Sequence, residues 1–569
     1  MYNKIFKYLK LRHRIPFVSI LCLLAIYASA QTVLSSRVDL AMIQVFQNPQ
    51  KPQPSPQNNN QNKKGDPKLI KIIYSSVYSK QENSDNQVLI DSVVFLHDGA
   101  YLYCDSAYFN KTTNSFDAFS NVRMEQGDTL FLYGNYMHYD GNLKLAQVRE
   151  NVRLEHREST LFTDSLDYDR MMNIGYYFDG GILIDESNNN ELTSFWGQYE
   201  PNTRMATFKD SVQLVNPKFV LYSDLLKYNT QSKLAFVTTP SRIVSDSGIV
   251  YTSNAIYNTD TDDAILLDQS TIVNKEGNRF LRGDSIFSNT TLGVGEVFGN
   301  MFLQDTVKKM ILRGNYGYYD DKINFALASD SAFCIEYSQG DSLYLHADTL
   351  KIQTDSIYRD IRAYYGVRFY RSDIQGVCDS MKFHSRDSIL HLYNDPILWN
   401  KGNQLSGDTI DIYLNDSTID LVHVKNNSFS IEQKDSIHFN QMKGRSLKAF
   451  LEAGQLRRVL VEGNGESVFY PQESNGYVIL HNWLKSAYME IFFSEGKFEK
   501  MKAWPSPEGK ATPLELLPLP ERRMEGFYWY DYLRPLDKDD IFREVKKKAG
   551  DIPPPRPKVF SMPDASNEF

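Results

Sequence analysis

The sequence predicts an all-β fold that is elongated and built from about twelve units of about thirty residues each. Between residues 71 and 504, short runs of Val, Ile, Leu and Tyr alternate with Gly, Asn, Asp and Ser, and helical periodicity is nearly absent. Tyrosine and phenylalanine are frequent, with 36 and 33 copies among 569 residues, as expected of strands. An aromatic residue also recurs at steps of 29 to 31 residues, at Phe109, Tyr139, Tyr168, Tyr199, Tyr228 and Tyr257.

Residues 1–30 are typical of a secretory signal peptide. A basic segment over residues 4–14 precedes an apolar run over residues 15–27, and Ala28-Ser29-Ala30 supplies the small-x-small pattern before Gln31. The apolar run is shorter than the roughly 20 residues of a membrane-spanning helix, which disfavours an uncleaved anchor. We therefore expect that the chain is exported to the periplasm, where it can associate with the outer membrane.

Residues 31–68 are predicted to be a linker, because the stretch from Gln44 is rich in Gln, Asn, Pro and Lys and cannot bury a core. The signal peptide holds five basic residues and no acidic ones, so its loss takes the formal net charge from −8 to −13. Broad nucleic-acid binding needs a basic face, so no nucleic-acid partner is expected.

The repeat itself follows, with a first half over residues 69–300 and a second half over 301–517. Each unit opens on a small residue, then Asp, Asn or Ser, then an apolar and an aromatic position, as in CDSAYFN (104–110) and GNYMHYD (134–140). A second segment reads roughly Ala-x-x-x-x-Asn/Asp-x-Val-x-apolar, as in AQVRENVRL (146–154) and ATFKDSVQL (206–214). One unit is therefore strand, turn, strand, turn, and stacked copies bury one another's apolar faces.

Side chains alternate between the two faces of a strand. In the first strand of the unit this alternation groups Tyr103 with Phe109, and in later copies Phe162 with Leu166 and Tyr222 with Leu226. That face is mostly apolar and aromatic, so we predict that it points inward. The residues on the predicted inward face are Phe109, Met137, Tyr139, Phe162, Leu166, Tyr168, Tyr199, Tyr222, Leu226, Tyr228 and Tyr257.

Three cysteines, Cys104, Cys334 and Cys378, remain after the signal peptide. An odd and sparse set does not make a disulfide framework. Cys104 and Cys378 occupy the small position of the repeat, which elsewhere holds residues such as Gly134, so we interpret both as packing residues; one disulfide or a redox role stays the alternative.

The sequence contains no pattern that indicates catalysis, and we expect no enzyme activity, cofactor or metal. His-Glu-x-x-His, Gly-x-Ser-x-Gly, phosphate-loop and dinucleotide-binding patterns are all absent. The Asp/Asn column of the repeat could form a calcium ladder, but the Gly-rich nonapeptides of such solenoids are missing. A polysaccharide-cleaving β-helix could hide its acids among the many Asp residues.

Residues 518–569 form a Pro-rich tail with an aromatic cluster at 527–530, and we expect one short helix over residues 539–548. Stacked repeats expose sheet edges at their ends, which are sticky unless they are covered. We expect the tail to cap one such edge.

The repeats resemble the OstA-like family, which includes the periplasmic lipopolysaccharide-transport bridge proteins with the organic solvent tolerance N-terminal-like domain. The units GDTLFLYGNYMHYDGNLKLAQVRENVRL (127–154) and ESTLFTDSLDYDRMMNIGYYFDGGILI (158–184) carry the resemblance, together with PEGKATPLELLP (507–518). It extends over roughly residues 69–517 and rests on the pattern of the repeat, not on active-site residues.

This resemblance implies an open β-jellyroll, or β-taco, in which two sheets fold over an apolar groove. It implies a periplasmic role in lipopolysaccharide transport and outer-membrane assembly, in which the groove holds the acyl chains of lipopolysaccharide or lipid A. Sheet edges would join the chain to inner-membrane and outer-membrane components of the transport system. The inward face listed above supplies the candidate groove residues; plain core packing is the alternative for each of them.

Two other classes of function stay open. An outer-membrane β-barrel is compatible with alternating strands, many aromatic residues and a signal peptide. It would place an Asp or Asn beside the aromatic residue on a lipid-facing side in nearly every unit, which is costly. An adhesin-like β-solenoid scaffold is the third reading.

Overall fold

The computed structural model describes residues 69–551 except for short gaps at residues 81–84, 290–291, 308, 321, 324, 338–340, 356–357, 416–418, 453–454, 473–476 and 495–496. The predicted signal peptide, the linker and the last 18 residues lie outside this range. The described chain forms two compact units. The N-terminal unit holds residues up to 307 and 313–326, and the C-terminal unit holds 309–312 and 327–551. The division of the repeats at residue 300, made from the sequence, stays a prediction.

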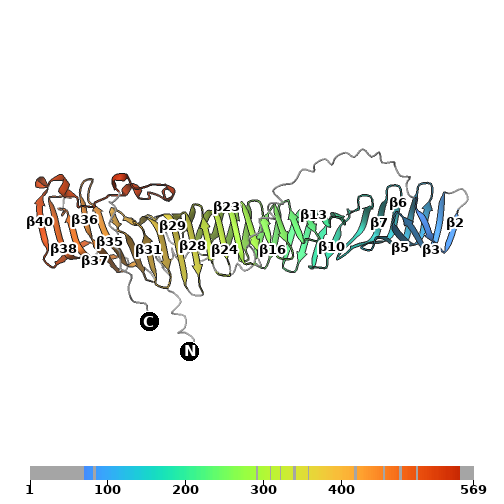
Figure 1. Cartoon of the computed structure of the whole chain (residues 1–569), viewed down its shortest axis with the longest axis horizontal. Helices are drawn as coiled ribbons and strands as arrows, with labels where there is room; N and C mark the ends of the chain where they lie inside the picture. Colours follow the sequence, from blue (N-terminus) through green and yellow to red (C-terminus); the bar gives the residue numbers. More distant parts are fainter. Residues whose placement is uncertain are drawn as a thin grey trace, which may run out of the picture. The chain divides into compact units, whose positions relative to one another are not determined.

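The N-terminal unit consists almost wholly of antiparallel strands (Figure 1). They are β1 (Lys71–Tyr74), β2 (Val77–Lys80), β3 (Asn86–His97), β4 (Ala100–Asn110), β5 (Ser115–Gln126), β6 (Leu130–Asp140), β7 (Leu145–His156), β8 (Ser159–Asp169), β9 (Ile174–Tyr177), β10 (Gly181–Asp185), β11 (Asn190–Ser194), β12 (Trp196–Glu200), β13 (Met205–Asn216), β14 (Phe219–Asn229), β15 (Leu234–Val237), β16 (Ser241–Ser245), β17 (Gly248–Thr252), β18 (Ala255–Asn258), β19 (Ala264–Leu266), β20 (Ser270–Asn274), β21 (Arg279–Gly283), β22 (Ser285–Asn289) and β23 (Val294–Asp305). The strands β24 (Met310–Asp320) and β25 (Phe325–Ser329) follow where the two units divide.

A β-bulge interrupts alternate long strands at their middle, as in β5 and β7. In β5 the pairing with both neighbours is interrupted at Ser120 and Asn121, which have φ angles of 62° and 49°. Glu150 and Asn151 do the same in β7, with φ angles of 64° and 53°. An extra residue in one strand kinks it, and here the kink recurs at the same place in every unit. The halves before and after the bends therefore form two sheets.

We call these sheet A and sheet B. In the first repeats, sheet A holds the halves next to the turns at residues 111–114 and 141–144, and sheet B holds the halves next to the turns at 98–99 and 127–129. Further along, the bends separate the halves into strands of their own, so that β9 pairs with β12 in sheet A and β10 with β11 in sheet B. The bends form one side of the interior, and we call the opposite side, where the turns of the two sheets face each other, the mouth.

The predicted small column of the repeat lies at this bend. A side chain at Gly134 would collide with Val148, and one at Gly283 with Val297, so the next strand approaches too closely for a larger residue. Cys104 and Cys378 fill the same column and are buried free thiols. Their packing role explains why cysteine stands there.

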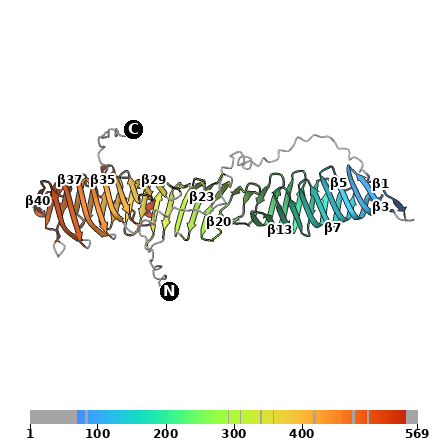
Figure 2. The same ribbon diagram turned by 90° about the horizontal axis from the view of Figure 1, so that it is seen from below.

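The C-terminal unit repeats the same architecture (Figure 2). Its strands are β26 (Ala332–Glu336), β27 (Leu343–Ala347), β28 (Thr349–Thr354), β29 (Arg359–Tyr370), β30 (Gln375–His384), β31 (Ile389–Tyr393), β32 (Ile397–Asn400), β33 (Asn403–Ser406), β34 (Thr409–Leu414), β35 (Ile419–Gln433), β36 (Phe439–Glu452), β37 (Gln455–Phe469), β38 (Leu480–Ser494), β39 (Lys497–Trp504) and β40 (Glu508–Pro513). The predicted all-β, repeat-built fold is confirmed.

The C-terminal tail differs from the prediction in two respects. In the described residues after β40 the chain forms single 3-10 turns, η2 (Leu514–Leu516), η3 (Leu519–Arg522), η4 (Asp531–Leu533), η5 (Asp540–Phe542) and η6 (Ala549–Asp551), in place of a helix over 539–548. After η5 the chain stays extended, because Val545 packs beside Tyr530 and Leu533, and the Lys547 and Lys548 ammonium groups lie over tyrosine rings.

The tail also packs on the outer face of sheet B instead of capping an edge. Buried tail residues such as Met524 and Tyr530 contact Ile431 and Trp399, which point away from the interior. Two glutamine side chains of sheet B fix the tail main chain. Gln404 donates to Tyr528 O and accepts from Tyr530 N. Gln441 likewise donates to Arg522 O and accepts from Met524 N, and all four hydrogen bonds are 2.8–2.9 Å long.

Candidate functional site

The interior between sheets A and B of the N-terminal unit is the candidate site. Nine of the eleven residues predicted to face inward are buried there: Phe109, Met137, Tyr139, Leu166, Tyr168, Tyr199, Leu226, Tyr228 and Tyr257. They come from sheet A, and the buried side chains of sheet B, such as Leu102 and Met124, face them. The structure thus brings most of the predicted set into one apolar interior.

Phe162 and Tyr222 are exceptions, and their predicted inward orientation is wrong. Their exposed fractions are 42% and 38%, and both lie on the outer face of sheet B. Strict alternation from Leu166 would place Phe162 inward, but the bend at residues 163–164 shifts the alternation by one position. Leu161 and Leu221, one residue earlier in each case, point inward and are buried.

The two sheets contact each other directly. The ring of Phe95 on sheet B stacks on that of Phe116 on sheet A with a centroid separation of 4.2 Å, and Phe116 packs against Tyr139 at 5.3 Å. Farther along, Phe219 of sheet B meets Tyr257 of sheet A at 4.6 Å. The interior is filled by the protein's own side chains in this state.

Polar side chains bridge the mouth. Arg170, in a turn of sheet A, donates to the main-chain oxygens of His97 and Asp98 at 3.1 and 3.2 Å and to Oε1 of Gln126 at 3.1 Å, all on sheet B. It also donates to the Tyr139 hydroxyl at 2.7 Å, which links the bridge to the interior.

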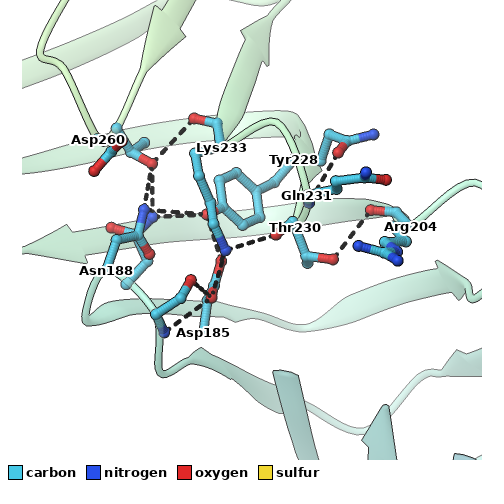
Figure 3. A network of polar contacts seen from close by, with 12 residues as sticks. Asp185, Asn188, Arg204, Tyr228, Thr230, Gln231, Lys233 and Asp260 are labelled. Carbon is cyan, nitrogen blue, oxygen red and sulfur yellow. Dashed lines mark hydrogen bonds and ion pairs between the residues drawn. The ribbon is translucent and has the colours of Figure 1, made fainter. Parts of the chain in front are cut away.

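The most buried bridge joins Asp185 at the end of β10 to Lys233 in the turn before β15 (Figure 3). The Lys233 ammonium lies 2.8 Å from Asp185 Oδ2, and the aspartate side chain is fully buried. Tyr228 donates to the same carboxylate at 2.6 Å and accepts from Asn190 Nδ2 at 2.9 Å. Asn190 in turn donates to Thr259 Oγ1 of sheet A at 2.8 Å. A buried charge pair with its remaining hydrogen-bonding groups satisfied is costly to break.

The hydroxyl groups of two interior tyrosines lie among these polar side chains at the mouth. The hydroxyls of Tyr139 and Tyr199 lie 2.7 and 2.8 Å from Nδ1 of His97 and His156, each on the opposite sheet. Burial raises the pKa of Tyr139 and Tyr199, so both phenols stay neutral. Burial, together with Arg157 and Arg204, lowers the pKa of His156. The rings of Tyr139 and Tyr199 therefore line the apolar interior, and their neutral hydroxyl groups lie at the mouth.

Comparison with known proteins gives a family match and a similar solved structure. Residues 74–224 match the family model described as OstA-like protein. The chain carries an OstA-like region. This confirms the resemblance that the repeats indicated. Among solved structures, the chain is similar to LptH, described as the LptA-homologous periplasmic component of the conserved lipopolysaccharide transport device from Pseudomonas aeruginosa. The match has 13% identity and a TM-score of 0.14, and it covers 24% of this chain and 74% of that one. No curated protein matches.

The bridges of the OstA-like region and of the repeats that follow it were missed from sequence, although they form a column of their own. Lys144, Asn173, Arg204, Lys233 and Asp262 each precede a strand of sheet A with φ angles of 56–63°. Lys144 pairs with Asp98, Asn173 with Gln126, Lys233 with Asp185 and Asp262 with Lys218. Their spacing of 29 to 31 residues matches the repeat and could have indicated them, but the residue type changes from one repeat to the next.

The three described cysteines are buried and have raised pKa values. Burial raises the pKa of the Cys104 and Cys334 thiols to about 12 and also raises that of Cys378, which keeps all three protonated and unreactive. Within the described range, no group of three or more His, Cys, Asp or Glu is placed to hold a metal ion. No helix there combines the length and apolar character that crossing a membrane requires.

Among the described strands, β1 and β2 at one end of the repeats and β39 and β40 at the other each pair with a single strand. At the start of the OstA-like region, β1 and β2 pair with β3, and Ile73, Tyr74 and Tyr78 are more than half exposed. At the other end of the chain, β39 and β40 pair with β38 and carry Lys500 and Lys502. Edge strands of this kind can accept a further strand.

Proposed function

We propose that this protein is a periplasmic lipid-binding protein of lipopolysaccharide transport and outer-membrane assembly. In this role the interior between sheets A and B holds the acyl chains of lipopolysaccharide or lipid A. The observation that carries the proposal is the apolar interior that passes from repeat to repeat within an OstA-like region. The role requires no catalytic group.

Acyl chains suit this interior because binding needs only apolar contacts. The chain is acidic overall, with a formal net charge of −8, which disfavours contact with phosphorylated head groups. Contact restricted to the acyl chains, with the head group outside the mouth, removes that conflict. Because the sheets touch through Phe95 and Phe116, an acyl chain enters only if the mouth opens and the rings move apart.

Partners and localisation follow from the same proposal. The leader at residues 1–30 would export the chain to the periplasm, where it would associate with the outer membrane. The single-partner strands β1 and β2, and β39 and β40, would accept strands of inner-membrane and outer-membrane transport components. Exposed apolar groups favour docking at the first pair, and lysines restrict non-specific pairing at the second.

Site-specific photocrosslinking in cells tests the proposal. A photoreactive phenylalanine analogue replaces Tyr228, whose side chain is buried in the interior, or Lys227, its exposed neighbour on the outer face. Circular dichroism and export assays verify that both variants fold and reach the periplasm.

A lipopolysaccharide adduct at position 228 and none at position 227 is the expected result. A second interior position, Leu226, keeps the test valid if the Tyr228 variant does not fold. Absence of adducts at both interior positions in folded, exported protein would contradict lipid binding. The filled interior would then be an ordinary core, and a scaffold role would replace the proposal.

A further inference from the structure

The outer face of sheet B in the N-terminal unit carries a row of arginine and aromatic side chains. Cross-strand pairing places Arg123 beside Tyr133 and Tyr133 beside Arg153. Farther along the same row, Arg242 lies between Tyr222 and Tyr251. We call this the outer row; Phe162 and Ile182 also belong to it.

The middle part of the outer row carries exposed aromatic and aliphatic side chains on either side of the polar residues Thr193 and Gln213. Phe162, Ile182, Tyr222 and Tyr251 have exposed fractions of 42%, 39%, 38% and 45%. Arg242 lies over the Tyr222 ring at 4.8 Å, which holds its guanidinium in place at the surface. Exposed aromatic side chains that recur along one line, in contrast to scattered ones, indicate a site of interaction.

In the C-terminal unit the chain's own tail covers the equivalent row. Arg368 follows the bend at Tyr365–Gly366 as Arg123 follows the bend at Ser120–Asn121, so the two arginines have the same repeat position. Arg368 donates to Leu533 O at 3.1 Å. Its row neighbour His346 packs against the Phe542 ring at 4.9 Å.

The same covering continues along that row. Ile397 packs with Tyr530 and Leu533. Beyond it, Phe429 lies 6.5 Å from the Phe527 ring, and Lys443 donates to Glu525 O at 3.1 Å. The tail thus supplies two things to the row: main-chain oxygens for the cations, and aromatic or aliphatic side chains for the apolar positions.

We propose that the outer row of the N-terminal unit is a docking site for an extended polypeptide segment of a partner protein. The segment would present main-chain oxygens to Arg242 and aromatic side chains to Tyr222 and Tyr251. The tail on the C-terminal unit shows that this chemistry fits the row, and none of the described residues covers the row of the N-terminal unit.

Charge argues against an anionic membrane or polysaccharide as the occupant. Arg123 and Arg153 form ion pairs with Glu125 and Glu155, which lie on the same outer face of sheet B. The face therefore offers donors and rings with little net positive charge, which suits a neutral main chain better than a polyanion.

Fluorescence anisotropy tests the docking site with a synthetic peptide of residues 522–548, labelled with a fluorophore, and the full exported chain. The expected result is saturable binding that the double substitution Tyr222→Ser/Tyr251→Ser weakens at least tenfold. Arg242→Ser alone is expected to weaken it several-fold. Tyr108→Ser, an exposed position on the outer face of sheet A, is the matched control and should leave binding unchanged.

The variant Gln404→Ala/Gln441→Ala separates this binding from exchange with the tail. A peptide that binds only by replacing the loosened tail would bind more strongly to this variant. Its binding would also be unaffected by the Tyr222 and Tyr251 substitutions. These two results together would overturn the proposal. Two further results would also overturn it. One is row-dependent binding of phosphatidylglycerol vesicles without peptide binding. The other is a dimer, detected by sedimentation, that the row substitutions abolish, since a second copy would then be the occupant.

Discussion

The hydroxyl of Tyr228 donates a 2.6 Å hydrogen bond to Asp185 on the opposite sheet, and the same carboxylate holds the Lys233 ammonium at 2.8 Å. Asp185 on sheet B therefore contacts both an interior residue, Tyr228, and a mouth residue, Lys233, of sheet A. Any opening of the interior at this repeat has to separate these three groups. The strength of this contact sets how readily the two sheets part.

Lys233→Met is expected to loosen the mouth at this repeat, because it leaves the fully buried Asp185 carboxylate without its cation. Removal of one partner of a buried pair costs about 3 kcal/mol or more. Hydrogen exchange measured by mass spectrometry should show faster exchange at residues 185–190 and 228–234. Lys218→Met is the matched control, since the Lys218–Asp262 pair also spans the mouth but Lys218 is 61% exposed. Equal effects of the two substitutions would contradict the importance of burial.

Acid is expected to weaken the repeat that contains His156. Because the pKa of His156 is lowered from 6.5 in the folded protein, the unfolded state binds the proton first as the pH falls. The stabilisation from neutral His156 is complete above about pH 6.5 and is lost below it. The protection factors of residues 152–156 and 196–200, which correct hydrogen exchange for its intrinsic pH dependence, should therefore fall between pH 7.5 and 5.5. His156→Asn should remove most of this pH dependence; an unchanged profile would assign it to another group.

The small column at the bend should tolerate Cys104→Ala but not Gly134→Leu. The alanine fits a space that already holds a thiol, and we expect a change in unfolding free energy within about 1 kcal/mol. A leucine at residue 134 would collide with Val148, and overpacking of this kind costs about 1–3 kcal/mol. Urea denaturation of the two variants tests the comparison. Strong destabilisation by Cys104→Ala would point to a role of the thiol beyond packing.

The double substitution Gln404→Ala/Gln441→Ala is expected to release the C-terminal tail. It removes four hydrogen bonds to the tail main chain, each worth about 1 kcal/mol. Limited proteolysis should cut the tail near residues 522–530 at least tenfold faster than in the parent protein. Gln213→Ala, on the outer face of the N-terminal unit, serves as the control. Unchanged cleavage would mean that apolar packing around Tyr530 and Met524 alone retains the tail.

The repeat could be predicted because its aromatic and small columns recur with nearly constant chemistry. Tyr139, Tyr168 and Tyr228 were placed inward correctly, since each lies in the half-strand after the bend, where alternation continues without interruption. The bend itself was missed. Its two residues, such as Ser120 and Asn121, read as ordinary turn-forming residues within a strand, and only the pairing of both neighbours shows that they shift the alternation.

The closing of the mouth could not be predicted from patterns of residue type. Its bridges pair a cation with an anion in one repeat, an amide with an amide in the next and the reverse charge order in a third, as in Lys233–Asp185, Asn173–Gln126 and Asp262–Lys218. Each pair is local to one repeat and complementary only in three dimensions. The covering of sheet B by the tail was likewise hidden, because Gln404 and Gln441 resemble any other polar strand residue.

The bend at the same place in every unit also limits how such a chain can evolve. Loss or gain of one residue within a strand would turn the apolar side chains of one half outward, and loss of a single strand would reverse the direction of all later ones. Loss or duplication of one complete out-and-back pair, such as β5 with β6, keeps direction, alternation and bend in place. Descendants of this gene should therefore differ in length by multiples of about thirty residues, which would let natural selection adjust the reach of the protein without redesigning its interior.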